Sequence, residues 1–200
     1  MAAALAPLSL TNLGSATGPT LQAELTTARR FRYLLENRRV AVGPDLALVF
    51  ENRETLWFRL QELGRVARLT SAAHVRHELD WYTRLLPAAG TLTAALWVGA
   101  TGRRATRAAA QSRDGLAHGR VTFVDATGAT VAGHVRGDRV HDRLIGVVGW
   151  VEFAFTPAEV AAFATPGRGW HLAVEAGGVR VESDTLGDGV WHSLNADLAG

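Results

Sequence analysis

Five consecutive polar residues, Glu51 to Thr55, follow a run of apolar residues and form the most distinctive group with chemical potential in this sequence. The side chain of Asn52 can accept a hydrogen bond from a free backbone N–H at a helix start, and Glu54 in the first turn suits the helix dipole. Neither role requires Glu51 or Arg53. Such a junction also offers N–H groups and a guanidinium to a carboxylate or phosphate. The turn therefore predicts either a helix start alone or a helix start that also binds a small anion.

His74, His77 and Glu78 have a spacing that brings metal-ligating groups together on a helix. His74 and Glu78 are one helical turn apart, and His77 is next to both. Two imidazoles and a carboxylate suit Zn or non-haem Fe. In the zinc-peptidase helices the histidines are four residues apart with a glutamate between them, and the order here is different. The pattern leaves two interpretations: surface histidines, or a metal site completed by another ligand such as His141.

A second group of titratable residues comprises His134, Asp138, His141 and Asp142. A histidine and an aspartate can act as a general base and the group that orients it. No nucleophile is evident beside them, and a solvated loop over residues 137–143 accounts for the same composition. Both interpretations, catalysis and a charged loop, stay open for this segment.

The composition argues against several kinds of site and several classes of protein. The chain has no cysteine, which excludes disulfides, thiolate metal sites and a cysteine nucleophile. All twenty-one basic residues are arginine, and because arginine does not titrate near neutrality, a net charge of only +2 gives a pI near 9.9. The arginines are scattered among acids, so we expect no nucleic-acid binding. No apolar run is long enough for a membrane span, and with no export signal recognisable we expect a cytoplasmic protein.

The elements that must position these residues are short and rich in hairpin signals. We predict one α+β domain over residues 1–200, with a loosely ordered arm at 1–19. It should hold about six to eight short, mainly antiparallel strands, with three to five helices on one face of the sheet. The expected strands are 39–42, 46–50, 92–98, 119–125, 130–136, 146–155, 170–175 and 179–183. Helical patterns cover six segments, 20–37, 53–69, 72–86, 101–112, 157–164 and 187–198, of which three to five should pack on the sheet.

The polar turn lies between a predicted hairpin and two predicted helices. Apolar stripes at helical spacing run through 53–69 and 72–86, and the second stripe includes Tyr82. Consecutive elements usually pack together. The order of the elements therefore permits Arg39, Glu51, Arg53, Glu78 and Tyr82 to converge on one pocket. Trp57, Trp97 and Trp150 fall on apolar elements, where core packing is the simplest role.

The stretches from Asn37 to Pro44, from Phe50 to Thr55 and from Glu78 to Tyr82 resemble an uncharacterised bacterial family, domain of unknown function 3501. The resemblance extends in outline over nearly the whole chain and is most specific over residues 37–98. Genes of this family often lie near genes for rubrerythrin-like and iron–sulfur oxidoreductase proteins. The resemblance thus implies a role in redox or peroxide-stress metabolism, with a site formed by the retained polar residues Arg39, Glu51, Asn52, Arg53, Glu78 and Tyr82.

Two polar segments of the family pattern are absent here. A Lys-Thr-Ser stretch corresponds to Leu144-Ile145-Gly146, and an Asp-His-Pro-x-Tyr segment corresponds to Glu175-Ala176-Gly177-Gly178-Val179. A retained charged turn beside depleted downstream segments favours an accessory protein that binds a small anion or a protein partner in a redox pathway. The alternatives are a metal-dependent oxidoreductase with Fe or Zn at His74, His77 and Glu78, and a purely structural partner domain. The sequence requires no cofactor.

Overall fold

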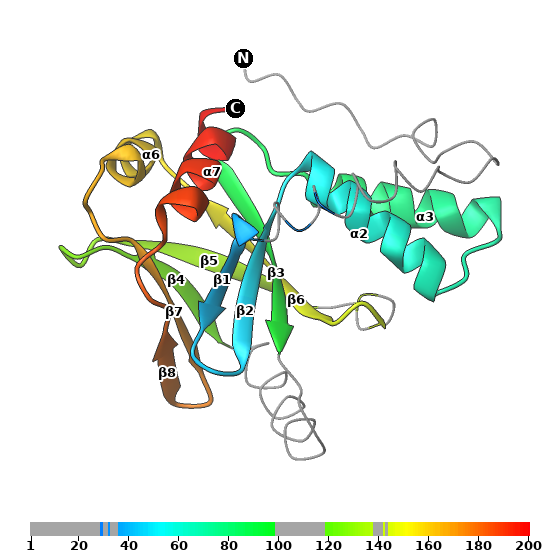
Figure 1. Cartoon of the computed structure of the whole chain (residues 1–200), viewed down its shortest axis with the longest axis horizontal. Coiled ribbons are helices and arrows are strands. Elements are labelled where there is room, and N and C mark those ends of the chain that lie inside the picture. Colours follow the sequence, from blue (N-terminus) through cyan, green and yellow to red (C-terminus); the bar gives the residue numbers. More distant parts are fainter. Residues whose placement is uncertain (1–28, 30–31, 33–35, 99–118, 138–141, 143) are drawn as a thin grey trace.

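The computed structural model describes residues 29, 32, 36–98, 119–137, 142 and 144–200, and all structural statements concern these residues (Figure 1). The predicted arm over 1–19, the predicted helix over 101–112 and most of the predicted helix over 20–37 lie outside them. The strands are β1 (Arg39–Val42), β2 (Leu46–Glu51), β3 (Thr91–Val98), β4 (Arg120–Val124), β5 (Thr130–Gly137), β6 (Val147–Ala154), β7 (His171–Ala176) and β8 (Val179–Glu182). The helices are α2 (Arg53–Val66), α3 (Ala72–Thr83), α6 (Pro157–Ala164) and α7 (Asp188–Ala199).

The eight strands form one antiparallel sheet in the order β1-β2-β3-β6-β5-β4-β7-β8. The sheet curves so far that its two edges approach each other, and the backbone N–H of Gly43 donates to the carbonyl of Glu182 at 3.3 Å. The sheet is therefore nearly closed. An antiparallel α+β fold with eight strands confirms the predicted fold class.

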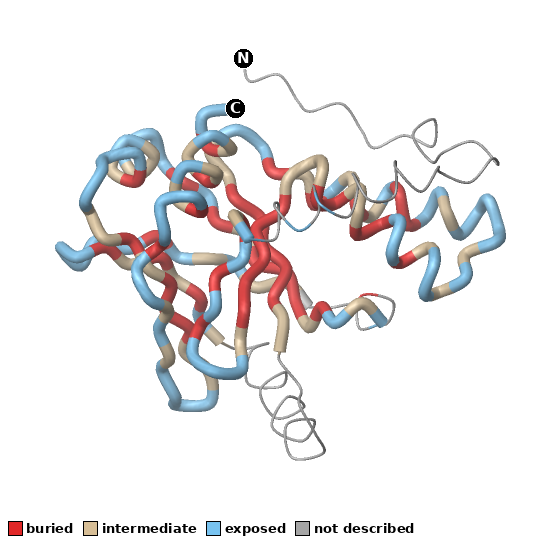
Figure 2. Tube along the Cα trace, viewed as in Figure 1, coloured by how far each residue is buried: buried red, intermediate tan, exposed pale blue. Residues whose placement is uncertain are grey.

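Helices pack against both faces of the sheet, so the prediction that they lie on one face is wrong. The inner face carries a cluster that includes Phe50, Phe123 and Phe153 and is capped by α6 and α7. The outer face of β3 and β6 carries a second cluster, in which Ala95 and Trp150 pack against α2 and α3. Figure 2 shows buried chain running along both regions. The physical reason is that β2 and β3 are apolar at consecutive positions, and a strand of that kind buries both faces.

The start of α2 confirms the predicted cap. The Oδ1 of Asn52 accepts from the backbone N–H groups of Glu54 and Thr55, both at 3.0 Å. The reciprocal bond comes from the N–H of Asn52 to the Oγ1 of Thr55, at 2.8 Å, so Thr55 rather than Glu54 completes the capping box. At α6, Thr156 and Glu159 form a second capping box. These caps fix where β2 ends and α2 begins, and hence the position of Glu51.

Asp125 organises the turn between β4 and β5, where the sequence predicts a hairpin. Its Oδ1 accepts from the N–H of Thr127 and of Ala129, both at 2.9 Å, and its Oδ2 accepts from the Nε of Arg168 at 2.6 Å. Burial acts to raise the pKa of this carboxyl, but the hydrogen bonds from Thr127, Arg168 and Ala129 outweigh it and lower the pKa from 3.8 to about 2.

Replacing Asp125 by asparagine should destabilise the protein at neutral pH and remove one source of acid sensitivity. A carboxyl whose pKa is lower in the folded state stabilises the fold above its unfolded pKa, and this contribution disappears as the pH falls toward the folded value. The difference in the free energy of unfolding between wild type and Asp125→Asn should therefore be largest near pH 7 and decrease between about pH 4 and pH 2. Urea unfolding across this range measures it, and a gap independent of pH would contradict the assignment.

Candidate functional site

A buried polar centre lies between the outer face of the sheet and the helices α2 and α3. We use this name for Glu51, Arg59, Glu78, Tyr82 and Asp142, all of which are buried. Glu51 ends β2, Arg59 lies on α2, and Glu78 and Tyr82 lie on α3. Side chains alternate along a strand, so the residue after the inward-facing Phe50 points outward, toward α2. The centre therefore joins three elements that are consecutive in the sequence to Asp142, which is distant from them.

Arg59 is the cation of this centre. Its Nη2 forms a buried ion pair with the Oε1 of Glu51. Its guanidinium also lies over two indole rings, 5.3 Å from the centroid of Trp97 and 5.7 Å from that of Trp150. A cation between two aromatic faces gains from their quadrupoles, and the gain increases when water is excluded. The positive charge of Arg59 is thus matched by one carboxylate and two rings.

Asp142 is the acceptor at the other side of the centre. Its Oδ2 accepts from the Nε1 of Trp150 at 3.0 Å, and its Oδ1 faces the Oη of Tyr82 at 3.4 Å. Burial raises the pKa of the Tyr82 hydroxyl above its ordinary value, the neighbouring carboxylates of Asp142, Glu51 and Glu78 raise it further, and Arg59 partly offsets this. Tyr82 therefore stays a neutral hydroxyl and acts as a hydrogen-bond donor.

Within the described residues, three polar atoms around Arg59 are buried without a hydrogen-bond partner: the Oε2 of Glu51, the Nε of Arg59 and the Nε1 of Trp97. Leaving such atoms unpaired costs free energy, so the centre is not simply optimised for stability. Within the centre, the charge of Glu51 is paired with that of Arg59, and Asp142 accepts from Trp150 and faces the hydroxyl of Tyr82. The arrangement can hold α2 and α3 at a defined position on the sheet, because a buried charge tolerates little displacement from its partner.

The structure brings together only half of the predicted ligand-binding set. Glu51, Glu78 and Tyr82 belong to the buried polar centre. Arg39 is exposed at the start of β1. Asn52 caps α2, and Arg53, the first residue of α2, is half-buried and has interactions of its own. No surface shared by Arg39, Glu51 and Arg53 results, because Glu51 is only 1% exposed.

The structure does not bring the predicted metal ligands together. His74 and His77 are exposed on α3, whereas Glu78 is 2% exposed and faces the sheet. Among the residues that the structure describes, no group of three His, Cys, Asp or Glu side chains could hold a metal ion.

In the second group of titratable residues, around residues 134–142, Asp138 and His141 lie outside the described residues. His141 is also the additional metal ligand that the sequence suggested. His134 is exposed on β5, whereas Asp142 is fully buried and adopts helical backbone where the sequence predicts a loop. The expected pairing of a histidine base with an aspartate from this segment is not seen between these two residues.

Sequence reasoning missed Arg59 and the role of Asp142. Arg59 lies three residues after Leu56 and four before Leu63, which places it on the apolar stripe of α2. Glu78 occupies the equivalent place on α3, three residues after Val75 and four before Tyr82. A charged residue within an apolar stripe is the signal that identifies both. The burial of Asp142 has no comparable signal, because its partners come from other elements.

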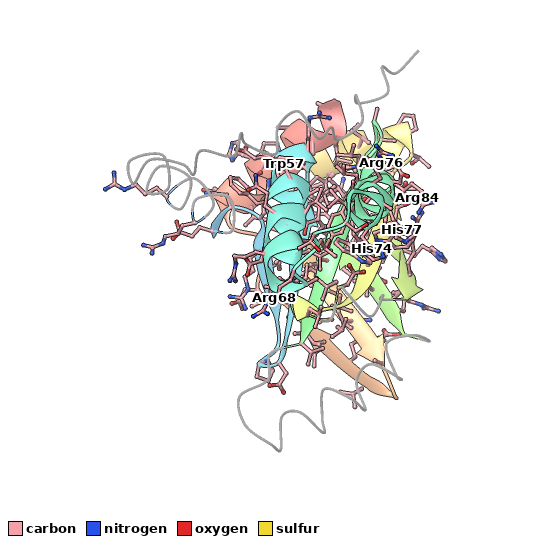
Figure 3. The ribbon with its side chains drawn as sticks, turned by 90° about the vertical axis from the view of Figure 1, so that its right-hand side faces the viewer. Trp57, Arg68, His74, Arg76, His77 and Arg84 are labelled. Carbon is pink, nitrogen blue, oxygen red and sulfur yellow. The ribbon has the colours of Figure 1, made fainter. Side chains whose placement is uncertain are left out.

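The exposed side of α3 forms a second polar group, which we call the α3 face: His74, Arg76, His77, Asp80 and Arg84, the last being the residue that caps the helix. Figure 3 shows the two histidines and two arginines on α3, on the side away from α2, whereas Arg68 lies at the lower end of α2. Neither Arg76 nor Arg84 forms an ion pair within the described residues. The guanidinium of Arg84 lies 5.2 Å from the ring centroid of Trp81.

Comparisons with known proteins agree with this fold and leave the activity open. The family pattern described as "Protein of unknown function (DUF3501)" matches residues 25–198. A crystal structure of a novel protein of unknown function from Burkholderia pseudomallei K96243 has a TM-score of 0.68 and 22% identity, covering 88% of this chain and 92% of that chain. No curated protein matches. In the described part of the chain, no helix is long and apolar enough to cross a membrane.

Proposed function

We propose that this chain, which belongs to the DUF3501 family of proteins of unknown function, is an accessory protein that binds an anionic partner. The proposal places this role in redox or oxidative-stress metabolism and in the cytoplasm. The alternative of an Fe- or Zn-dependent oxidoreductase stays a prediction, and no group of ligands among the described residues favours it.

One observation supports the proposal: the charged and polar side chains of the buried polar centre contact one another between the sheet and the helices α2 and α3. Glu51 and Arg59 neutralise each other, and Trp150 and Tyr82 donate toward Asp142. Figure 1 shows α2 and α3 projecting beyond the sheet as a pair. A rigidly held, protruding helix pair with exposed arginines suits recognition, because preorganised side chains lose less conformational entropy on binding.

The binding part of the proposal is tested with poly-L-glutamate as the probe and poly-L-lysine as the control. Tryptophan fluorescence follows the titration, since Trp57 and Trp81 lie half-buried on the helix pair. We expect saturable binding of poly-L-glutamate that weakens as salt is raised, because exposed charges are screened beyond roughly 10 Å at about 0.1 M ionic strength. Absence of binding to poly-L-glutamate at low salt, or equal binding of poly-L-lysine, would contradict the proposal.

The metabolic part is tested in the organism of origin by deleting the gene and challenging the cells with hydrogen peroxide. We expect slower recovery of the deletion strain and restoration by the wild-type gene supplied in trans. Recovery indistinguishable from that of the parent strain, across peroxide and iron-limitation challenges, would remove the redox assignment while leaving the binding result unaffected.

A further inference from the structure

We propose that the α3 face is the surface on which the partner docks, and that the partner presents carboxylates from an acidic protein surface. This inference rests on the proposed function and specifies its site. Arg76, Asp80 and Arg84 are spaced by four residues, which aligns them along one side of α3. His77 is exposed three residues before Asp80, and His74 is exposed a further three residues toward the start of the helix.

The two arginines of the α3 face are available to a ligand. Six other arginines of the described residues form an ion pair with a carboxylate: Arg38, Arg59, Arg65, Arg136, Arg168 and Arg180. Arg76 and Arg84 form no such pair within the described residues, although Asp80 lies on the same side of the helix. Their planar guanidinium groups can each accept a carboxylate through two parallel hydrogen bonds.

Arg84 is also held in place before any partner arrives. Its guanidinium lies over the ring of Trp81, 5.2 Å from the centroid, and Trp81 is half-buried. Stacking limits the rotamers of a long side chain, so less entropy is lost when the arginine binds. Arginine and tryptophan are also the residues that most often dominate the free energy of protein interfaces. Arg84 with Trp81 is therefore the expected anchor of the α3 face.

The charge of the α3 face favours a protein over a nucleic acid or an anionic membrane. Two arginines with one aspartate between them give a low net charge, whereas duplex binding commonly involves about 6–10 phosphate contacts. A fixed acid within the face also repels a uniform array of phosphates. An acidic protein surface can place separate carboxylates on Arg76 and Arg84, with a neutral or donor group facing Asp80.

The test compares three variants by their affinity for poly-L-glutamate. Arg76→Gln with Arg84→Gln should weaken binding by about tenfold or more, because both carboxylate contacts are lost. Asp80→Asn should strengthen binding severalfold, because a like charge is removed from the face. Arg68→Gly is the matched control: it removes one arginine from the turn that follows α2, away from the α3 residues labelled in Figure 3.

The control variant is expected to fold at least as well as wild type. Arg68 has a φ of 51°, in the left-handed region that favours glycine, and the N–H of Leu69 closes the turn onto the carbonyl of Gly64 at 3.0 Å. Circular dichroism melts verify that all three variants are folded. Arg68→Gly should bind within about twofold of wild type, since its charge lies away from the α3 face.

The possible outcomes distinguish a failure of the proposed binding function from a failure of the α3 face as its docking surface. If wild type does not bind poly-L-glutamate, the proposed function fails. If wild type binds and the folded Arg76→Gln/Arg84→Gln variant binds equally well, the docking surface lies elsewhere and this inference alone is overturned. If Arg68→Gly loses as much affinity as the Arg76→Gln/Arg84→Gln variant, the inference is also overturned, because binding would then depend on net charge alone. Tighter binding of a mixed-sequence DNA duplex or of phosphatidylglycerol vesicles than of poly-L-glutamate would overturn the choice of an acidic protein.

Discussion

Replacing Arg59 by methionine is expected to lower the free energy of unfolding by about 3–5 kcal/mol, because the carboxylate of Glu51 then stays buried without its cation. The side chains of Arg59 and Glu51 are 8% and 0% exposed, so water cannot replace the lost partner. The cation over the rings of Trp97 and Trp150 is lost as well. Urea unfolding followed by circular dichroism gives the change, and a loss below about 1 kcal/mol would show that the pair is not the main constraint on α2.

A double variant distinguishes the contribution of the ion pair to the free energy of unfolding from the destabilisation caused by an unpaired buried charge. The double variant Glu51→Leu with Arg59→Met should recover most of the lost stability, because an apolar pair of similar volume suits the surrounding cluster. Arg65→Met is the control on the same helix. Arg65 and Glu62 are 72% and 50% exposed, so breaking their pair should leave the free energy of unfolding nearly unchanged. A double variant as unstable as Arg59→Met alone would contradict this account.

The binding assay, applied to the double variant, tests whether the buried polar centre itself contacts the ligand. If the buried polar centre serves only to position α2 and α3, Glu51→Leu/Arg59→Met should retain affinity for poly-L-glutamate. If it binds the ligand itself, that affinity should fall although the fold is restored. Together with the α3-face variants, this result assigns recognition either to the exposed helix or to the buried polar centre.

The second large effect is expected on the inner face of the sheet, where Phe123→Ala should lower the free energy of unfolding by about 3–5 kcal/mol. Phe123 is fully buried on β4. Its ring centroid lies 4.7 Å from that of Phe153, 5.4 Å from that of Phe163 and 5.6 Å from that of Phe50. These rings come from β6, α6 and β2, so one side chain joins three elements that are distant in the sequence. Alanine leaves a cavity that this interlocked cluster cannot close.

A graded pair of substitutions tests whether this loss comes from the cavity. Phe123→Leu retains most of the volume and should cost markedly less than Phe123→Ala, about 1–1.5 kcal/mol. Val179→Ala on β8 is the exposed control, since Val179 is 63% exposed and should change stability by less than about 0.5 kcal/mol. Thermal and urea unfolding measure all three. Equal losses for leucine and alanine at position 123 would point to ring–ring geometry rather than volume as the source of the stability.

The local elements of this protein follow from its sequence because their causes lie within a few residues. Asn52 and Thr156 have hydroxyl or amide oxygens at the point where an apolar helical pattern begins, and both cap a helix. Asp125 and the glycine at position 128 define a hairpin turn. Arg59 and Glu78 could also have been identified from sequence, since each interrupts an apolar stripe at helical spacing. Such features require only near neighbours, and the sequence contains those neighbours.

Which surfaces of the elements meet depends on long-range packing that local sequence patterns do not specify. Pairing β3 with β6, and β4 with β7, involves segments far apart in the chain, and no local pattern selects among the possible orders. That order places α2 and α3 over the outer face, which turns Glu51 from an expected surface ligand into a buried partner of Arg59 and brings Asp142 to Tyr82 and Trp150. It also leaves Arg76 and Arg84 exposed on α3. The physical reason is that burial depends on what covers a residue, and the covering element is selected by long-range packing rather than by the residue's own neighbours.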